Sequence, residues 1–434
     1  MEKHVWEKVQ AVWFIALATL MYYFLSETLN LGVFVTYRHV FAILIVISGV
    51  ISFLIRPDLA RGAVALRGAL IYSLPLLVTV AVSLFIWFVD QVDVDIISRG
   101  LSGAFIFTNM LSSALAAATM LYIFGEKGIW YNLLALLIAN FLMIGTIVAE
   151  NGLGPYLQEL WVLIYTFAGE TGEIIVQAEI HELAFCLGAY LIYMVLFPKK
   201  KTLYFVFFGL GLFCFLCAFK RIGILAIGAS LCLALFLKLI QWLRASSVKF
   251  WIGFVSTLLF LVLFAYIFVI KMDVFEMLQE AGVETSGRDV IYNAVDPYYE
   301  FSPEFLGHGI GFLTYTLSQN TSIGVSAVHN DFLQYYIDLG FFGYLFWLLA
   351  MTVGRVAWFG RKGRVNGAIL TFTLLIYLVV ASMTDNTINY PLLTCVLAIL
   401  MMGFGFDNEV REMEEKLFGS VSLRNQKKKK ENLL

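Results

Sequence analysis

The sequence predicts an all-α, polytopic integral membrane protein with about twelve transmembrane helices and one large loop outside the membrane. The first observation is composition: 61% of the residues are hydrophobic, 14% are charged, and the mean hydropathy is +0.85. The second is that apolar runs long enough to cross a bilayer core of about 30 Å recur along the chain. In lipid every backbone polar group must be bonded internally, so such runs indicate helices. The third is a single long polar interval at 271–331.

The first apolar run follows a polar start, and no small-residue cleavage site comes after it. We therefore interpret it as an uncleaved anchor and not as a signal peptide. In chain order, the expected spans lie near 9–26, 38–55, 68–89, 101–124, 129–148, 180–197, 202–219, 222–242, 250–270, 335–357, 366–384 and 390–406.

These spans divide the chain into four parts. Residues 1–270 hold the spans before the loop, and 271–334 form the large loop that carries candidate site residues. Residues 335–406 hold the last spans, and 407–434 form a basic tail. The tail is compatible either with a helix lying on an anionic inner leaflet or with a solvated tail that only helps to set topology.

Basic residues indicate the orientation, because cytoplasmic loops of membrane proteins are enriched in Lys and Arg. The basic residues fall in alternate loops, together with the tail: Arg56, Arg61, Arg67, Lys127, Lys199, Lys200, Lys201, Arg244, Lys249, Arg355, Arg361, Lys362, Arg364 and Lys427–Lys430. Arg38, Arg99 and Lys271 are isolated exceptions. Both termini are therefore predicted to be cytoplasmic and the large loop extracytoplasmic, where neither ATP nor a nucleotide sugar is available.

Composition also limits partners and cofactors. The net charge of −2 gives no reason to expect nucleic acid. The five cysteines lie in apolar runs and are expected to be small core residues. We expect no metal and no cofactor.

Lys220 and Arg221 break the charge pattern, because they occupy a very short turn on the predicted outer side. Charges near membrane depth are costly and usually functional, so the pair predicts an anion site, although snorkelling to lipid phosphates would also explain it. Arg288 stands among acidic residues, where it could form a surface ion pair or contribute to the same site. His329 precedes Asn330, which could simply cap the next helix.

Two further polar positions have open interpretations. Glu182 lies at the outer start of a span and could contact a ligand or serve the helix N-terminus. Asp385 and Asn386, between the last two spans, could join the site or only turn the chain.

The order of these motifs resembles the superfamily of O-antigen polymerases and O-antigen ligases, which are bacterial envelope glycosyltransferases. The matching segments are Lys220–Gly223, Gly287-Arg288, Pro303–Gly309, His329–Gln334 and Leu339–Gly343. The sequence departs from the family pattern at Phe219-Lys220, where many members have a small or hydroxyl residue before the arginine.

The resemblance implies a GT-C-like fold in the bacterial inner membrane and transfer of a glycan from undecaprenyl pyrophosphate to an acceptor sugar hydroxyl. It implies catalytic roles for His329 as a base and for Arg221 and Arg288 as groups that take the charge of the departing pyrophosphate. Substrate binding is assigned to Lys220, Asn330, Gln334, Gly307, Gly309, His308 and Tyr315. The implied partners are the lipid-linked oligosaccharide, an acceptor glycan and membrane lipids, with chain-length regulators and flippases as candidates.

Three functions remain open. A polymerase that joins lipid-linked repeat units is favoured, because such enzymes are common across bacteria. A ligase that uses the same donor with another acceptor, such as lipid A core, is the alternative. A transporter or flippase is disfavoured, because it would place charged or broken helices at mid-membrane, whereas the ionisable residues here crowd the outer edge.

Overall fold

The computed structural model describes residues 2–24, 36–89, 96–166, 174, 180–218, 220–280, 288–319, 328–362 and 364–417. Those residues form helices and contain no strand, which confirms the all-α class. The first part of the chain contains α1 Glu2–Tyr23, α2 Tyr37–Ile55, α3 Leu59–Tyr72, α4 Leu74–Val89, α5 Ile96–Phe124, α6 Lys127–Asn151, α7 Leu153–Thr166, α9 Ile180–Leu196, α10 Thr202–Ala218, α11 Arg221–Arg244 and α12 Val248–Lys271. The second part contains α13 Val274–Glu280, α14 Arg288–Val295, α15 Phe312–Gln319, α16 Asp331–Leu349, the π-helical segment Ala350–Gly354, α17 Arg355–Lys362, α18 Arg364–Ser382 and α19 Pro391–Gly403.

The expected spans fall on helical segments, although the span near 68–89 is divided between α3 and α4 and the span near 335–357 continues from α16 through the π-helical segment into α17, and the count of twelve is not confirmed. In the described part of the chain, seven helices are long and apolar enough to cross a membrane, or up to nine if two bent pairs count as one span each. α9 and α10 are apolar but shorter. The structure therefore supports a multi-pass membrane protein, and the remaining spans stay predictions.

Helix α19 is the centre of the bundle. Its sequence is apolar on all sides, and every residue from Pro391 to Gly403 is buried. It packs against α5, α9, α3 and α6. A helix that is hydrophobic all round belongs inside a bundle, whereas α2 and α12 present much of their apolar surface outward.

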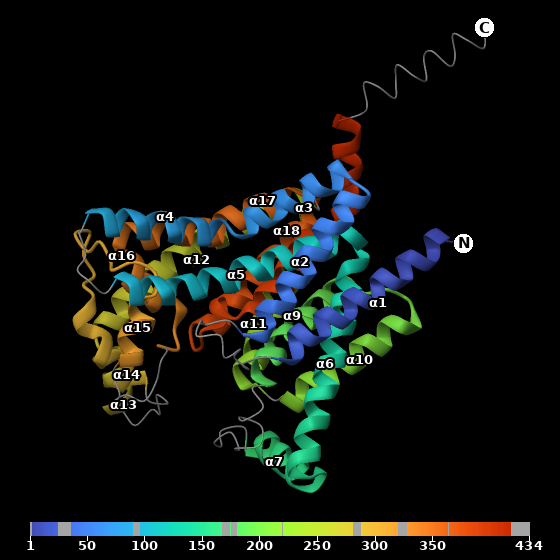
Figure 1. Cartoon of the computed structure of the whole chain (residues 1–434). Helices are drawn as coiled ribbons and strands as arrows, with labels where there is room; N and C mark the ends of the chain where they lie inside the picture. The colour runs from blue at the N-terminus through green and yellow to red at the C-terminus, as the bar shows by residue number, and fades with distance from the viewer. Residues whose placement is uncertain are drawn as a thin grey trace.

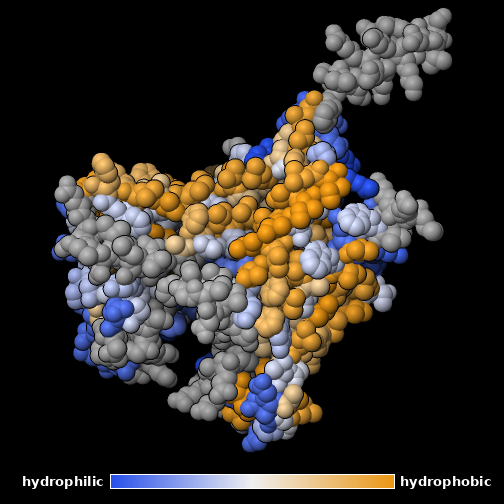
Figure 2. Space-filling view, in the orientation of Figure 1, coloured by the Kyte–Doolittle hydropathy of each residue, from blue (hydrophilic) through white to orange (hydrophobic). Residues whose placement is uncertain are grey.

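The helices α13, α14 and α15, here called the outer segment after their predicted location, lie away from the ends of the chain. Figure 1 shows α13, α14 and α15 gathered at one end of the structure, whereas the start of α1 and the last described helix, Phe406–Leu417, lie toward the opposite side. In Figure 2, hydrophobic residues cover the bundle between hydrophilic residues at these two ends. This distribution is the one a bilayer requires, with polar groups at both surfaces and an apolar belt between them.

A buried cation links two spans inside the bundle. The α3–α4 pair bends by 55°. Arg355 donates from Nε and Nη2 to the carbonyl oxygen of Tyr72 at this bend, over 3.0 and 2.6 Å. Arg355 was expected in a cytoplasmic loop, but it is buried here, because the carbonyl at the bend needs a donor that the helix no longer supplies.

The cysteines agree largely with the expected role in packing. All five are free; Cys186, Cys214, Cys217 and Cys395 are buried, whereas Cys232 is exposed on α11.

Candidate functional site

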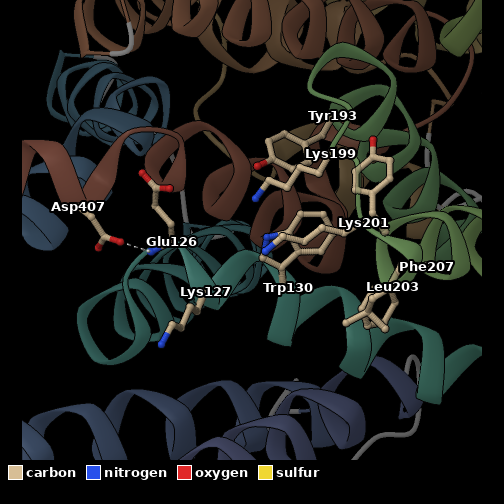
Figure 3. A pocket seen from close by; sticks show the side chains of 10 residues that line it. Glu126, Lys127, Trp130, Tyr193, Lys199, Lys201, Leu203, Phe207 and Asp407 are labelled. Atoms are coloured by element: carbon tan, nitrogen blue, oxygen red, sulfur yellow. Dashed lines mark hydrogen bonds between the residues drawn. The ribbon is translucent and has the colours of Figure 1, made fainter.

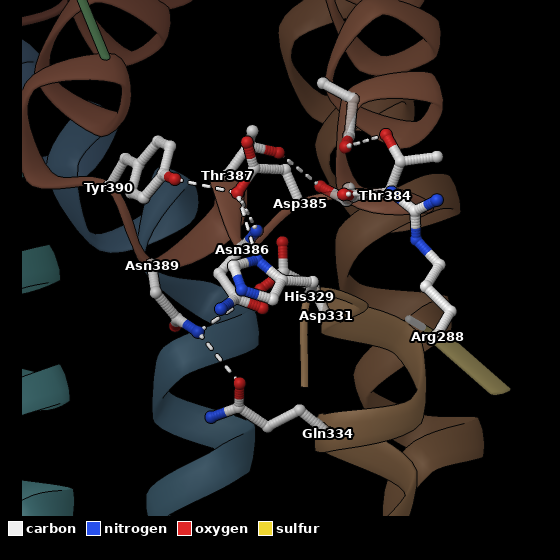
Figure 4. Close-up of polar contacts among 12 residues, drawn as sticks. Arg288, His329, Asp331, Gln334, Thr384, Asp385, Asn386, Thr387, Asn389 and Tyr390 are labelled. Carbon is white, nitrogen blue, oxygen red and sulfur yellow. Dashed lines mark hydrogen bonds and ion pairs between the residues drawn. The ribbon is translucent and has the colours of Figure 1, made fainter. Parts of the chain in front are cut away.

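Asp385 is the centre of a polar cluster in the connection between α18 and α19. Its carboxylate lies 3.2 Å from Lys220 Nζ and 3.8 Å from His329 Nδ1. The Tyr390 hydroxyl donates to it over 2.7 Å, and the Asn386 backbone N–H donates over 2.8 Å. Figure 4 shows His329 and Tyr390 converging on Asp385 from separate segments. The structure thus brings together Lys220 and His329, which are more than a hundred residues apart in the sequence.

The cluster keeps Asp385 ionised although the residue is buried. Burial by itself raises the pKa of this carboxyl group. The nearby His329 imidazole, the charge of Lys220, and the hydrogen bonds from Tyr390 and Asn386 outweigh burial, so the net pKa of Asp385 lies below the ordinary value. A fixed negative charge therefore stands beside the imidazole.

His329 is accessible, unlike the residues that follow it. Its backbone φ is +52°, a left-handed conformation that non-glycine residues rarely adopt, and its side chain is 46% exposed. Such outliers cluster at functional sites, because the surrounding structure must stabilise the strained conformation. The left-handed residue directs the imidazole out of the helix start toward Asp385.

Asn330 and Asp331 hold this helix start in place. The Asn330 side chain accepts a hydrogen bond from Leu333 N, as an N-cap does, and donates to the hydroxyls of Tyr266 and Tyr292. The Asp331 carboxylate accepts from the Ile388 N–H and from the Asn389 amide. Both residues are buried, so Asn330 has an internal capping role, and its predicted contact with substrate remains a prediction.

The two arginines lie at helix starts. Arg288 opens α14 and donates from Nη2 to the carbonyl oxygen of Thr384 over 3.1 Å, directly before Asp385 in the chain. Arg221 opens α11 immediately after Lys220 and is partly exposed. The 384–386 segment is therefore contacted by Lys220, Arg288 and His329. Arg221 is next to Lys220 in the chain and so lies near the same segment.

The glycine motif packs against the backbone of α16. Gly307 and Gly309 have φ values of +85° and +88°, and the N–H groups of His308 and Gly309 donate to the Asp338 carbonyl oxygen over 3.1 and 2.6 Å. A Cβ on Gly307 would lie 2.3 Å from Gly340 N. Because glycine has no side chain, these residues permit the glycine motif to touch the backbone of α16. This contact accounts for the glycines, and their predicted role in substrate binding remains a prediction.

The remaining predicted binding residues are also engaged internally. The His308 ring stacks on Phe312 at 3.9 Å, and its Nε2 lies 2.9 Å from the Tyr298 carbonyl oxygen. Gln334 donates to the Thr314 hydroxyl and accepts from Asn389. Tyr315 is partly exposed on α15.

Sequence reasoning left Asp385 undecided and missed Tyr390. Glu182 lies near the same cluster: it accepts from Leu392 N over 3.0 Å and pairs with Arg38 at 3.5 Å. The available signal was the set of ionisable residues at the outer ends of spans, because such positions are costly unless paired or functional. Among the described residues, no group of three or more His, Cys, Asp or Glu side chains is arranged to hold a metal ion.

The fold defines a multi-pass helical membrane protein with an accessible histidine among cationic side chains. Residues 205–348 match the family model described as O-Antigen ligase (Wzy_C). This match confirms the resemblance to the O-antigen polymerase and ligase superfamily and supports a glycosyltransferase-like enzyme. It contains Lys220, Arg221, Arg288 and His329 and ends before Asp385. The comparison with curated proteins finds no match.

Proposed function

We propose that this protein transfers a glycan from undecaprenyl pyrophosphate to the hydroxyl of an acceptor sugar on the outer face of the bacterial inner membrane. One observation carries the proposal: the accessible His329 lies beside an ionised Asp385, where Lys220 and Arg288 also converge. A base and several cations close together match a transfer that removes a proton from one partner and releases an anion from the other.

His329 acts on the acceptor. Its imidazole removes the proton of the attacking hydroxyl as the acceptor oxygen bonds to the anomeric carbon. The bond between that carbon and the pyrophosphate oxygen breaks, and its electron pair leaves with the pyrophosphate. Asp385, 3.8 Å from Nδ1, orients the ring and stabilises the imidazolium that forms, so it is a positioning residue.

The cations act on the donor. Negative charge grows on the departing pyrophosphate, and guanidinium groups can bind phosphate oxygens with two parallel hydrogen bonds. Arg221 is the candidate for this contact at the membrane surface, and Arg288 on α14 is the candidate for a second contact from the outer segment. Lys220 already pairs with Asp385 at 3.2 Å, which makes it a weaker candidate for direct phosphate binding than Arg221.

Two acceptors fit this site. The polymerase joins the donor glycan to another lipid-linked repeat unit, with chain-length regulators and flippases as candidate partners. The ligase joins it to lipid A core or another acceptor, and the family match over residues 205–348 is equally consistent with this second candidate.

The test uses cells that lack the native protein and carry the full-length chain or its His329→Ala variant. Surface glycan is separated by size, and lipid-linked glycan is measured in parallel. Loss of long chains with retention of single repeat units on the acceptor indicates a polymerase. Loss of all acceptor-bound glycan while lipid-linked chains accumulate indicates a ligase. Normal glycans in both fractions with normal amounts of the variant protein would refute the site.

Topology is tested separately. A cysteine at Ser302, which is partly exposed in the outer segment, should react with a membrane-impermeant thiol reagent in intact cells. A cysteine at Lys200, which is exposed at the opposite end, should react only after the cells are opened. If the cysteine at position 200 reacts in intact cells and the one at position 302 does not, the proposed site lies on the cytoplasmic side and the proposal is wrong.

A further inference from the structure

A polar pocket lies away from His329, at the end of the bundle predicted to be cytoplasmic. It has a volume of about 400 Å³, within the range of small-molecule sites. Its charged and aromatic lining comes from the start of α6, the turn before α10 and the segment after α19: Glu126, Lys127, Trp130, Lys199, Lys201 and Asp407. Figure 3 shows the two carboxylates facing Lys199 across the pocket.

Helix α9 runs between this pocket and the polar cluster around Asp385, so its length shows how far apart the two places are. Glu182 in its first turn bonds to Leu392 near Asp385, whereas Tyr193 in its last turn lines the pocket. Tyr193 follows Glu182 by eleven residues, which corresponds to a rise of about 16 Å along the helix, so the two places lie at different levels of the bundle. The pocket is therefore not part of the proposed transfer site.

The lining carries both signs of charge: the charge of Lys199 acts on Glu126, and Arg61 lies 3.9 Å from Asp407. Lys199 Nζ lies 4.9 Å above the Trp130 ring, and Lys127 and Lys201 are exposed at the mouth. On the other side, Asp407 accepts a hydrogen bond from Glu126 N at 3.5 Å. Burial, followed by the nearby Asp407 charge, raises the pKa of Glu126. A cation that enters the pocket would therefore stabilise the ionised form of Glu126.

These charges discriminate between classes of ligand. A simple anion would meet the lysines but also two carboxylates, and a simple cation would meet the carboxylates but also three lysines. A molecule with a phosphate and an ammonium group a few bonds apart can satisfy both signs of charge at once.

We propose that this pocket binds the head group of a zwitterionic aminophospholipid from the inner leaflet. Its phosphate contacts the lysines at the mouth, and its ammonium group reaches Glu126 and Asp407. Leu203 lines the same pocket and is 64% exposed, so apolar surface continues outward from the mouth, where acyl chains would lie. The proposal is independent of the glycosyl transfer proposed above.

The test measures lipid binding to the purified full-length protein by native mass spectrometry. The probes are phosphatidylethanolamine and phosphatidylglycerol with identical acyl chains, together with soluble glycerophosphoethanolamine. We expect phosphatidylethanolamine to bind more tightly than the other two probes. Glu126→Gln should weaken phosphatidylethanolamine binding about tenfold and leave phosphatidylglycerol unaffected, because only the first carries an ammonium group.

Lys199→Ala should weaken both lipids, whereas Lys200→Ala is the matched control, because Lys200 is the exposed neighbour that does not line the pocket. Equal or tighter binding of phosphatidylglycerol, unchanged in Glu126→Gln, would overturn the zwitterionic assignment. Binding of glycerophosphoethanolamine as tight as that of the lipid would overturn the lipid as source. If Glu126→Gln fails to accumulate, the lipid preference of the unmodified protein and its response to Lys199→Ala decide the question.

Discussion

Two histidines in neighbouring motifs of this protein have different structural roles. His308 lies between Gly307 and Gly309, stacks on Phe312 at 3.9 Å, and has its Nε2 2.9 Å from a backbone carbonyl oxygen. His329 has a side chain that is 46% exposed and faces Asp385. His308 belongs to the glycine motif that packs against α16. His329 is accessible to a substrate. Exposure and the nearest charge separate them, although both were assigned to the site from the sequence, His329 as the base and His308 to substrate binding.

The largest expected effect concerns the backbone contact on the His308 side. Gly340 interrupts α16 with φ +69°, and a Cβ there would lie 2.1 Å from the Leu306 carbonyl carbon. The left-handed conformation and the overpacking each cost about 1–3 kcal/mol, so Gly340→Ala should prevent accumulation of folded protein. The measurement is the yield of monodisperse protein after detergent extraction.

Gly228→Ala is the matched control for this prediction, because nothing lies within 4 Å of its added Cβ. Alanine also favours a helix over glycine by about 1 kcal/mol, so Gly228→Ala should accumulate normally. Normal yield of Gly340→Ala would show that the contact between the glycine motif and α16 is not required for folding.

The next prediction separates the two histidines directly. His329→Ala should lower transfer about 10²–10⁴-fold at normal protein levels, since it removes the base. His308→Ala should instead lower the yield of folded protein and leave the activity per folded molecule nearly unchanged. Both quantities are measured on the same membranes, by the glycan size distribution and by immunoblotting. Equal losses of activity per folded molecule in His329→Ala and His308→Ala would show that the two histidines do not have different roles.

Arg288→Lys tests the donor contact with little change of charge. A lysine keeps the positive charge but loses the planar, two-pronged donor geometry, so transfer should fall about tenfold or more. The decrease should appear as a lower maximal rate with the purified protein and a lipid-linked substrate. An unchanged rate would mean that Arg288 serves the fold through Thr384 and does not touch pyrophosphate.

The smallest expected effects concern the residues around His329. Asp385→Asn should reduce the rate and alter its pH profile, because the imidazolium loses its neighbouring charge. Lys220→Ala should give a partial loss, since Arg221 remains. A pH profile identical to that of the unmodified protein would show that Asp385 is only structural.

The sequence was informative wherever long apolar runs or paired cations stood out. The expected spans lie on helical segments, apart from the bend that divides the span near 68–89, and Lys220, Arg288 and His329 contact the same 384–386 segment or its carboxylate. The helix that contains the span near 335–357 begins at Asp331, because Asn330 caps it, as one interpretation of the sequence expected, and the buried partners of Asn330 and Asp331 compensate for the polar first turn.

Other features could not be predicted from one sequence. Asp385 lies in a short polar connection of the kind that joins any two spans, and only the folded chain shows four groups converging on it. Arg355 resembled a topogenic loop cation, and its burial depends on the bend at Tyr72, which local sequence does not reveal. The sequence indicates which ionisable residues lie in or near apolar spans. Their roles depend on contacts between segments that are distant in the chain, which the sequence does not reveal.

The burial of α19 along its whole length has a consequence for how a bulky carrier could enter. The connection that carries Asp385 continues directly into this innermost helix, so the anchor for the imidazole cannot shift without disturbing the entire bundle. Arg288, by contrast, stands on an eight-residue helix at the periphery. If the proposed function holds, a long-tailed donor would be admitted by displacement of α14, while His329 keeps its place beside Asp385.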